Sequence, residues 1–183
     1  MKRKANDFYP TPPEVIDALL DNYEIGGANT KILEPCAGDG QIIKSLKKNG
    51  YEKIKAVEIR EEESEKLNEL VGYGNFAITD YLKVNKKFLK EPDVIITNPP
   101  FSLAMEFIVK SLEDVTKDGK VIMLLRLGFL ASKTRYKFMK ENPPTDIYVL
   151  HKRPSFTGAG TDSQEYAWFV WDKAKTEQTL KVI

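Results

Sequence analysis

The fold is decided by the stretch Ile32-Leu33-Glu34-Pro35-Cys36-Ala37-Gly38-Asp39-Gly40. Two apolar residues lead into a turn that carries two glycines, and residues 41–49 then place Ile42, Ile43 and Leu46 on one helical face. A short apolar run followed by a glycine turn and a helical period predicts a strand that passes into a helix. Glycine in such a turn lets the backbone approach a ligand closely. We therefore expect a βα unit with a ligand site at its turn.

The same alternation of short apolar runs and charged amphipathic stretches continues along the chain, and it is typical of an α/β fold. The expected strands are 32–33, 54–58, 76–78, 94–97, 121–125, 147–150 and 166–171. The first expected helix begins near Glu14, and four more are expected over 41–49, 61–71, 105–112 and 132–140. Together they predict a doubly wound, Rossmann-like, mostly parallel sheet of seven strands with helices on both faces. Ligands of such a sheet bind beyond the carboxyl ends of the strands.

Length and charge limit the classes of function. The chain has 183 residues and a net charge of +1, so we expect a single domain over residues 1–183. A protein that coats nucleic acid would be more basic, whereas an enzyme that holds its substrate briefly need not be. The single cysteine excludes an internal disulfide, and no run of about 18 apolar residues predicts a membrane span. We expect a cytoplasmic protein that binds neither a membrane nor a metal.

Two acidic residues close later strands at the same predicted edge of the sheet. Glu58 follows the glycine turn by roughly twenty residues, the position at which an acid accepts hydrogen bonds from ribose hydroxyls in nucleotide folds. Asp80 follows the third expected strand, where it can accept from an adenine amino group. Taken alone, most acids at a strand end are simply solvated charges. Combined with the glycines, they favour a ligand that contains a nucleoside.

The most informative stretch is Asn98-Pro99-Pro100-Phe101, directly after the fourth expected strand. A conjugated amino nitrogen is a poor nucleophile because its lone pair is delocalised. The Asn98 side-chain oxygen and the Pro99 carbonyl can accept its hydrogens and favour a more tetrahedral nitrogen. The prolines stiffen the loop, and Phe101 offers a flat face for stacking. A plain Pro-Pro turn after a buried strand is the alternative.

These motifs resemble those of S-adenosylmethionine-dependent amino-methyltransferases, which have the class I methyltransferase fold. The segments 33–40 and 98–101 resemble motifs I and IV, Glu58 and Asp80 match motifs II and III, and 8–12 resembles the segment that precedes motif I in the gamma-like order. The resemblance implies catalytic roles for Asn98, Pro99, Pro100 and Phe101. It implies that the cofactor contacts Thr11, Glu34, Pro35, Ala37, Gly38, Gly40, Glu58, Ile59, Asp80, Tyr81 and Asn98.

The polar, glycine-rich segment 152–162 resembles the motif VIII region of adenine methyltransferases. Arg153 can meet phosphate and Phe156 can stack on an extruded base, so we expect substrate contacts at Phe101, Arg153 and Phe156. The alternative is an ordinary hairpin loop in which Phe156 is a hydrophobic plug. With the aromatic run 166–171, this region is most similar to that of small phage or prophage DNA adenine methyltransferases. A second basic set, within 126–140, suits phosphate or solvent equally.

The resemblance implies transfer of methyl groups to N6 of adenine in nucleic acid, with DNA favoured. One alternative is a nitrogen methyltransferase that acts on guanine in ribosomal RNA or on protein glutamine, and another is a binding module with weak catalysis. Cys36 lies in the cofactor turn, where a nucleophile of cytosine C5 methylation would not be, and His151 is expected to be a surface or structural residue. No segment is long enough for a separate target-recognition domain, so selectivity is expected to be low, loop-based or supplied by a partner. The sequence sets no oligomeric state.

Overall fold

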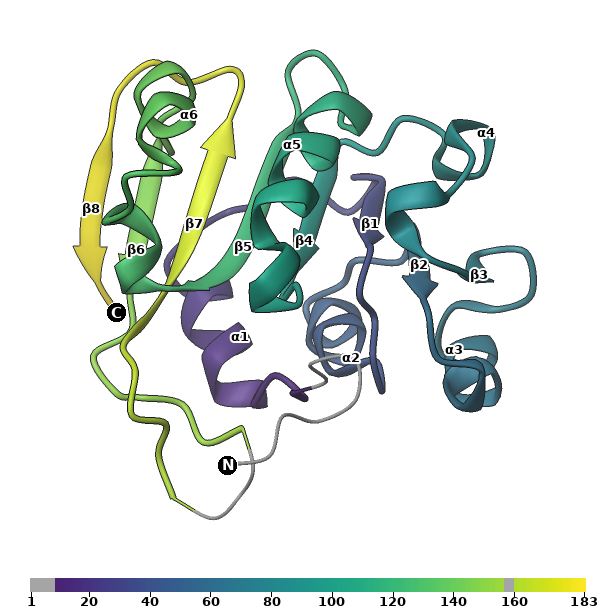
Figure 1. Cartoon of the computed structure of the whole chain (residues 1–183). Helices are drawn as coiled ribbons and strands as arrows, with labels where there is room; N and C mark the ends of the chain where they lie inside the picture. Colours follow the sequence, from purple (N-terminus) through teal and green to yellow (C-terminus); the bar gives the residue numbers. More distant parts are fainter. Residues whose placement is uncertain (1–8, 157–159) are drawn as a thin grey trace.

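The computed structural model describes residues 9–156 and 160–183. Phe8 of the predicted cofactor segment and residues 157–159 of the predicted substrate loop lie outside the described part. Within it, the chain forms one mixed sheet of eight strands with helices on both faces (Figure 1). None of the helices in the described ranges combines the length and apolar character that a membrane span requires.

The predicted α/β fold is confirmed, with small differences in its elements. The strands are β1 (Ile32–Glu34), β2 (Ile54–Glu58), β3 (Phe76–Ile78), β4 (Val94–Thr97), β5 (Lys120–Arg126), β6 (Asp146–Val149), β7 (Tyr166–Asp172) and β8 (Thr179–Val182). The helices are α1 (Pro13–Leu20), α2 (Gln41–Lys48), α3 (Ser64–Val71), α4 (Lys86–Leu89), α5 (Ala104–Asp114) and α6 (Tyr136–Glu141). The seven predicted strands are present, whereas β8 and α4 were not expected, and α6 begins later than predicted.

The order of the strands places the ligand site. It is β3-β2-β1-β4-β5-β7-β6-β8, and β1 pairs in parallel with both β2 and β4. The chain therefore winds from β1 outward to β3 and then crosses back to β4, which makes the β1/β4 boundary a topological switch point. The loops that leave β1 and β4 diverge there and open a crevice at the carboxyl edge. β7 is antiparallel to both β5 and β6, so it enters the sheet from this edge.

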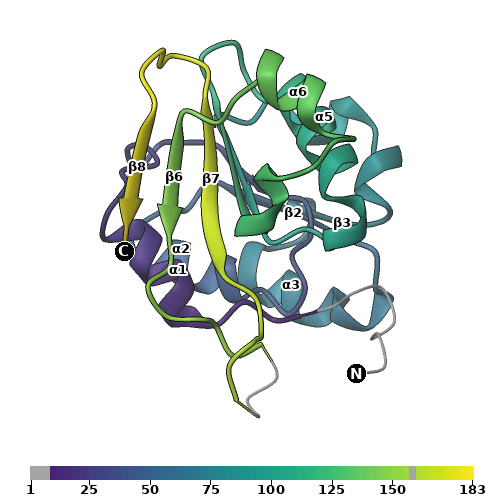
Figure 2. The same ribbon diagram turned by 60° about the vertical axis from the view of Figure 1, so that its left-hand side comes forward.

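Alternating apolar residues of the strands fill two separate cores. In β5, Ile122 and Leu124 face the core under α1, α2 and α3, whereas Val121, Met123 and Leu125 face the core under α5. Both layers are covered, which is why β5 reads as a continuous apolar run. Figure 2 shows the two sets of helices on opposite sides of the sheet.

The two tryptophans lie on opposite faces of β7. Trp168 is fully buried in the core under α1, and its indole Nε1 donates to the Val15 carbonyl at 2.9 Å. Trp171 packs in the other core and donates to the Asn142 carbonyl at 3.0 Å. Both are packing residues, as predicted, and the Trp168 bond fixes α1 against the sheet.

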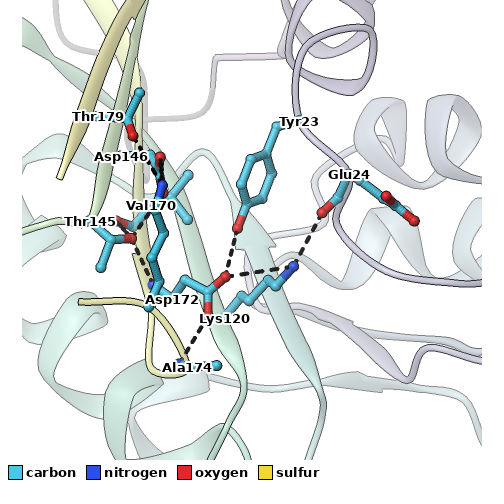
Figure 3. Close-up of polar contacts among 10 residues, drawn as sticks. Tyr23, Glu24, Lys120, Thr145, Asp146, Val170, Asp172, Ala174 and Thr179 are labelled. Atoms are coloured by element: carbon cyan, nitrogen blue, oxygen red, sulfur yellow. Dashed lines mark hydrogen bonds and ion pairs between the residues drawn. The ribbon is translucent and has the colours of Figure 1, made fainter. Parts of the chain in front are cut away.

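A polar cluster holds the edge of the sheet opposite the crevice (Figure 3). Asp172 at the end of β7 accepts from the Tyr23 hydroxyl at 3.2 Å and lies 3.7 Å from the Lys120 ammonium. The buried Asp146 carboxylate at the start of β6 pairs with the Lys175 ammonium at 2.6 Å. These contacts join the segment after α1 to the amino edge of the sheet. The crevice lies at the other edge, at the carboxyl ends of the parallel strands.

Candidate active site

A cavity of about 350 Å³ lies at the carboxyl ends of β1, β2, β3 and β4, within the size range of sites for small ligands. Its wall is built by the loops that follow these strands and by the segment before α1. The predicted cofactor residues that line it are Thr11, Glu34, Pro35, Ala37, Gly38, Glu58, Ile59, Asp80, Tyr81 and Asn98. Gly40 is absent from the lining that the described residues form.

The turn after β1 depends on its two glycines for different reasons. Gly38 has a φ of +57°, and its N–H donates to the Glu58 carboxylate at 2.7 Å, so the turn after β1 is tied to the end of β2. Gly40 has a φ of +80° and begins α2, and a Cβ there would lie 2.2 Å from Leu70 Cδ1. The structure therefore gives Gly40 a packing role against α3. A cofactor contact at Gly40 stays a prediction.

The Glu58 carboxylate is buried and already surrounded by donors. Its Oε1 atom accepts from the backbone N–H of Arg60 at 2.9 Å and from the Arg60 side chain at 3.1 Å. Arg60 also pairs with Glu63 at 3.0 Å and lines the cavity. Sequence reasoning missed Arg60 because a charged residue just after a strand reads as a solvated one. Its 12% side-chain exposure shows that it belongs to the wall of the site.

Glu34 presents a buried, unpaired oxygen to the cavity. Its carboxyl group is only 2% exposed, and Oε2 has no hydrogen-bond partner among the described residues. Burial raises the pKa of Glu34 well above its usual range, the nearby charges of Glu58 and Asp39 raise it further, and the backbone N–H of Ile43 opposes them. An orphaned polar atom of this kind is costly unless a ligand satisfies it.

The far end of the cavity combines polar and apolar groups. Asp80 lies after β3, where its carboxylate accepts from the Leu82 N–H at 3.0 Å. The Tyr81 hydroxyl turns away into α5 and donates to Asp114 at 3.0 Å, so Tyr81 meets the cavity with other atoms. The side chain of Ile59 is 55% exposed although it is apolar. This end can therefore take a flat, partly polar ring.

Asn98 follows β4 and links the cavity to the segment before α1. Its Nδ2 atom donates to Thr11 Oγ1 at 3.1 Å and to the Tyr9 carbonyl at 3.3 Å. The Oδ1 atom is buried, and none of the described residues donates to it. Pro99 is buried and Pro100 lines the cavity, so the loop that carries Asn98 is stiff. Within the described part of the chain, the site thus holds a fixed acceptor that receives no donor.

Four aromatic rings form a closed cluster beside Asn98. Tyr9, Phe101, Tyr166 and Phe156 contact one another in that order, with centroid distances of 6.5, 5.5 and 5.1 Å, and a 6.2 Å contact from Phe156 to Tyr9 closes the circle. The Arg126 guanidinium covers Phe101 at 4.8 Å and donates to the Tyr166 hydroxyl at 3.4 Å. The motif IV aromatic is therefore held by its neighbours.

The two other predicted substrate residues differ in exposure. Phe156 is 7% exposed and belongs to the core under α1, which is where the hydrophobic-plug alternative places it. Arg153 is half exposed and pairs with Glu165. Contacts of either residue with a base or a phosphate stay predictions. The basic residues within 126–140 do not share one helix, because α6 begins at Tyr136; Arg126 lies over Phe101, and Arg135 donates to the Phe129 carbonyl at 2.9 Å (Figure 1).

Cys36 and His151 take the places that the sequence favours. Cys36 lines the cavity, and burial, with the charges of Glu58 and Glu34, raises the pKa of its thiol well above the usual range. It is thus a poor nucleophile at neutral pH. His151 is exposed, and its Nδ1 atom lies 2.7 Å from the Ile183 carbonyl.

Comparison with known families identifies this arrangement. The sequence profile of the family described as adenine-specific methyltransferase EcoRI matches residues 30–151, which include β1 to β6 and the loops of the cavity. The chain belongs to this family. Comparison with curated protein sequences gives no match. Membership agrees with the amino-methyltransferase resemblance of the motifs, and Glu34, Glu58, Asp80 and Asn98 all lie within the matched range.

Solved structures share the class I methyltransferase fold. A modification subunit of a candidate type I restriction enzyme from Vibrio vulnificus has a TM-score of 0.68 at 18% identity, covering 96% of this chain and 47% of that one. A candidate RNA methyltransferase from Pyrococcus horikoshii has a TM-score of 0.68 at 20% identity, with 93% and 89% covered. A candidate class I S-adenosylmethionine-dependent methyltransferase from Listeria monocytogenes has a TM-score of 0.64 at 16% identity, with 93% and 62% covered. The 183-residue chain therefore spans about half the length of the Vibrio subunit.

Proposed function

We propose that the protein transfers a methyl group from S-adenosylmethionine to the N6 amino group of adenine in DNA. The observation that carries the proposal is the buried Oδ1 atom of Asn98 beside the cavity, to which no residue of 9–156 or 160–183 donates, in a chain of an adenine-specific methyltransferase family. A hydrogen-bond acceptor at this place suits an amino group, which brings two donors. We further infer one methyltransferase domain over residues 1–183, acting in the cytoplasm.

The donor set of the cavity fits S-adenosylmethionine, which supplies an electrophilic methyl group when bound. Glu34 and Thr11 would hold the methionine end, and the unpaired Glu34 oxygen suits a cationic ammonium group. Glu58 would accept from the ribose hydroxyls, and Asp80 from the adenine amino group. The exposed side chain of Ile59 would cover the adenine face. The turn at Gly38 leaves room for the chain of the cofactor.

Asn98 and Pro99 would act on the target amino group. Two acceptors that bind its hydrogens draw the nitrogen away from conjugation with the ring, so that its lone pair becomes available for attack on the methyl group. Because Asn98 is fixed by Thr11 and Tyr9, little reorganisation is needed when the base arrives. Pro100 stiffens the loop, and Phe101 would stack on the base at its site beside Tyr9 and Tyr166.

Recognition of DNA would rest on a small surface. Arg153 would contact phosphate after release from Glu165, and Phe156 would meet the extruded base from the neighbouring side. With a net charge of only +1, we infer that selectivity comes from these loops or from a partner. The similar solved structures include a modification subunit of a candidate restriction enzyme and a candidate RNA methyltransferase, so the test includes both DNA and RNA.

The test is transfer of labelled methyl groups from S-adenosylmethionine to duplex DNA, single-stranded DNA, ribosomal RNA and protein extract, followed by digestion and identification of the product. We expect N6-methyladenine from DNA. Asn98→Ala should lower transfer at least a hundredfold while cofactor binding survives, since one such acceptor is worth about 3 kcal/mol in the transition state. Asn22→Ala, in the exposed turn after α1, is the matched control. Label in guanine or glutamine would refute the adenine assignment.

A further inference from the structure

The side-chain amide of Asn98 can take two orientations, with its oxygen and NH2 group exchanged, and its neighbours decide between them. Oxygen and NH2 lie at equivalent positions of a planar group, and rotation about the last side-chain bond exchanges them. In this protein both contacts of the NH2 group go to acceptors of the segment before α1, Thr11 Oγ1 at 3.1 Å and the Tyr9 carbonyl at 3.3 Å. The oxygen is therefore turned away from that segment, where it is buried and receives no donor from the described residues.

The orientation decides whether the site can work. With Oδ1 toward the target, the amide accepts a hydrogen from the amino group. With the amide reversed, its NH2 would oppose the amino group of the substrate, donor against donor, and only the Pro99 carbonyl would remain to accept a hydrogen. The backbone carbonyl of Tyr9 is the weaker of the two restraints by its longer distance. The Thr11 hydroxyl, on a side chain that is 5% exposed, is the other.

We propose that Thr11 is a positioning residue that selects the catalytic orientation of the Asn98 amide, besides lining the cofactor cavity. This inference rests on the proposed N-methyltransferase function. Thr11 therefore joins cofactor site and target site through one hydroxyl group, whose oxygen accepts from Asn98.

The experiment compares Thr11→Val, which keeps the shape and loses the acceptor, with Thr11→Ser, which keeps the hydroxyl. Steady-state kinetics at saturating S-adenosylmethionine should show kcat lowered about tenfold in Thr11→Val, the effect of one lost hydrogen bond, and within about twofold of the parent in Thr11→Ser. Thr30→Val, in a turn outside the cavity, is the matched control. A change confined to the KM for the cofactor would overturn the proposal, because Thr11 would then be a cofactor contact only.

A second comparison, made in an Asn98→Asp variant, tests the orientation of the amide by itself. In Asn98→Asp both side-chain atoms are oxygens, so either orientation presents an acceptor. Adding Thr11→Val to Asn98→Asp should change kcat less than about twofold, and a loss as large as in the Asn98 protein would overturn the proposal.

A structural readout serves even if the variants have no activity. The side-chain amide of Asn98, followed by ¹⁵N NMR in the cofactor-free protein, should show two hydrogen-bonded protons in the parent and in Thr11→Ser. Thr11→Val should lose the protection of at least one of them, and an unchanged signal would overturn the proposal. If instead Asn98→Ala retains full transfer, the proposed function fails, while the NMR result still reports on the orientation.

Discussion

The ribose site offers the sharpest test of the cofactor assignment, through Glu58→Gln. The carboxylate is 5% exposed and accepts from Gly38 N at 2.7 Å, Arg60 N at 2.9 Å and Arg60 Nε at 3.1 Å. A glutamine of the same shape keeps one acceptor oxygen and places an NH2 group where the other oxygen stood. That group cannot accept from the turn at Gly38 or from a ribose hydroxyl.

The expected loss follows from the charge. A hydrogen bond to a charged acceptor contributes about 1.5–3 kcal/mol, and each 1.4 kcal/mol is about a factor of ten in Kd. One lost bond to the ribose therefore weakens S-adenosylmethionine binding about 10-fold to 150-fold. The kcat at saturating cofactor should change much less, since Glu58 lies far from Asn98 in the proposed arrangement of the cofactor.

Isothermal titration with S-adenosylmethionine measures the affinity directly, and a thermal melt checks that the variant is folded. Glu62→Gln is the matched control, because Glu62 is exposed in the 3-10 turn Glu61–Glu63 that follows β2 and does not line the cavity. A folded Glu58→Gln variant that binds the cofactor with unchanged affinity would refute the assignment of Glu58 to the ribose, and with it the placement of the cofactor.

Two further predictions concern the target ring and the buried acid. Phe101→Leu should lower kcat/KM for DNA about 5-fold to 100-fold and leave cofactor affinity unchanged, because stacking on an aromatic ring contributes about 1–3 kcal/mol per base; equal loss of cofactor affinity would contradict this. Glu34 has a raised pKa in the folded protein, so unfolding releases its proton, and the free energy of unfolding falls as the pH rises from the ordinary carboxyl range toward that raised pKa. In Glu34→Gln this loss is absent, so melting temperatures measured without cofactor from about pH 5 to about pH 8 should fall less steeply than in the parent. Melting temperatures that fall equally steeply with pH in Glu34→Gln and in the parent would contradict the raised pKa of Glu34.

Much of the fold could be predicted because it depends on local patterns. The apolar runs of β4 and β5 and the glycine turn after β1 each specify their structure within a few residues. β8 was missed because Thr179–Val182 is only four residues long, and its two apolar residues, Leu180 and Val182, stay exposed at the edge of the sheet. It forms because β6 offers it a free edge, which the sequence of β8 does not encode. The start of α6 was wrong because residues 133–135 form a turn, beside which the Ser132 and Thr134 hydroxyls bond each other at 2.8 Å, and the helix begins only at Tyr136.

The candidate site was predicted where a residue type follows a strand directly, as with Glu34, Glu58, Asp80 and Asn98. Residues whose role depends on how side chains are placed in three dimensions could not be predicted. Arg60 reads as a surface charge until Glu58 and Glu63 are placed around it. Tyr9 was part of a motif, yet its contact with Phe101 depends on how the segment before α1 crosses the loop after β4.

The placement of the two tryptophans on opposite faces of β7 makes the protein its own spectroscopic probe. Trp168 is bonded to α1 and Trp171 to the end of the α6 segment, so each indole samples a different layer of the molecule. Trp171→Phe leaves an emitter that senses the layer whose leading segment carries Thr11. Trp168→Phe leaves one that senses the layer of α5. Fluorescence of the two variants during a cofactor titration can then separate movement of the methionine-side segment from movement of the far layer, without any added dye.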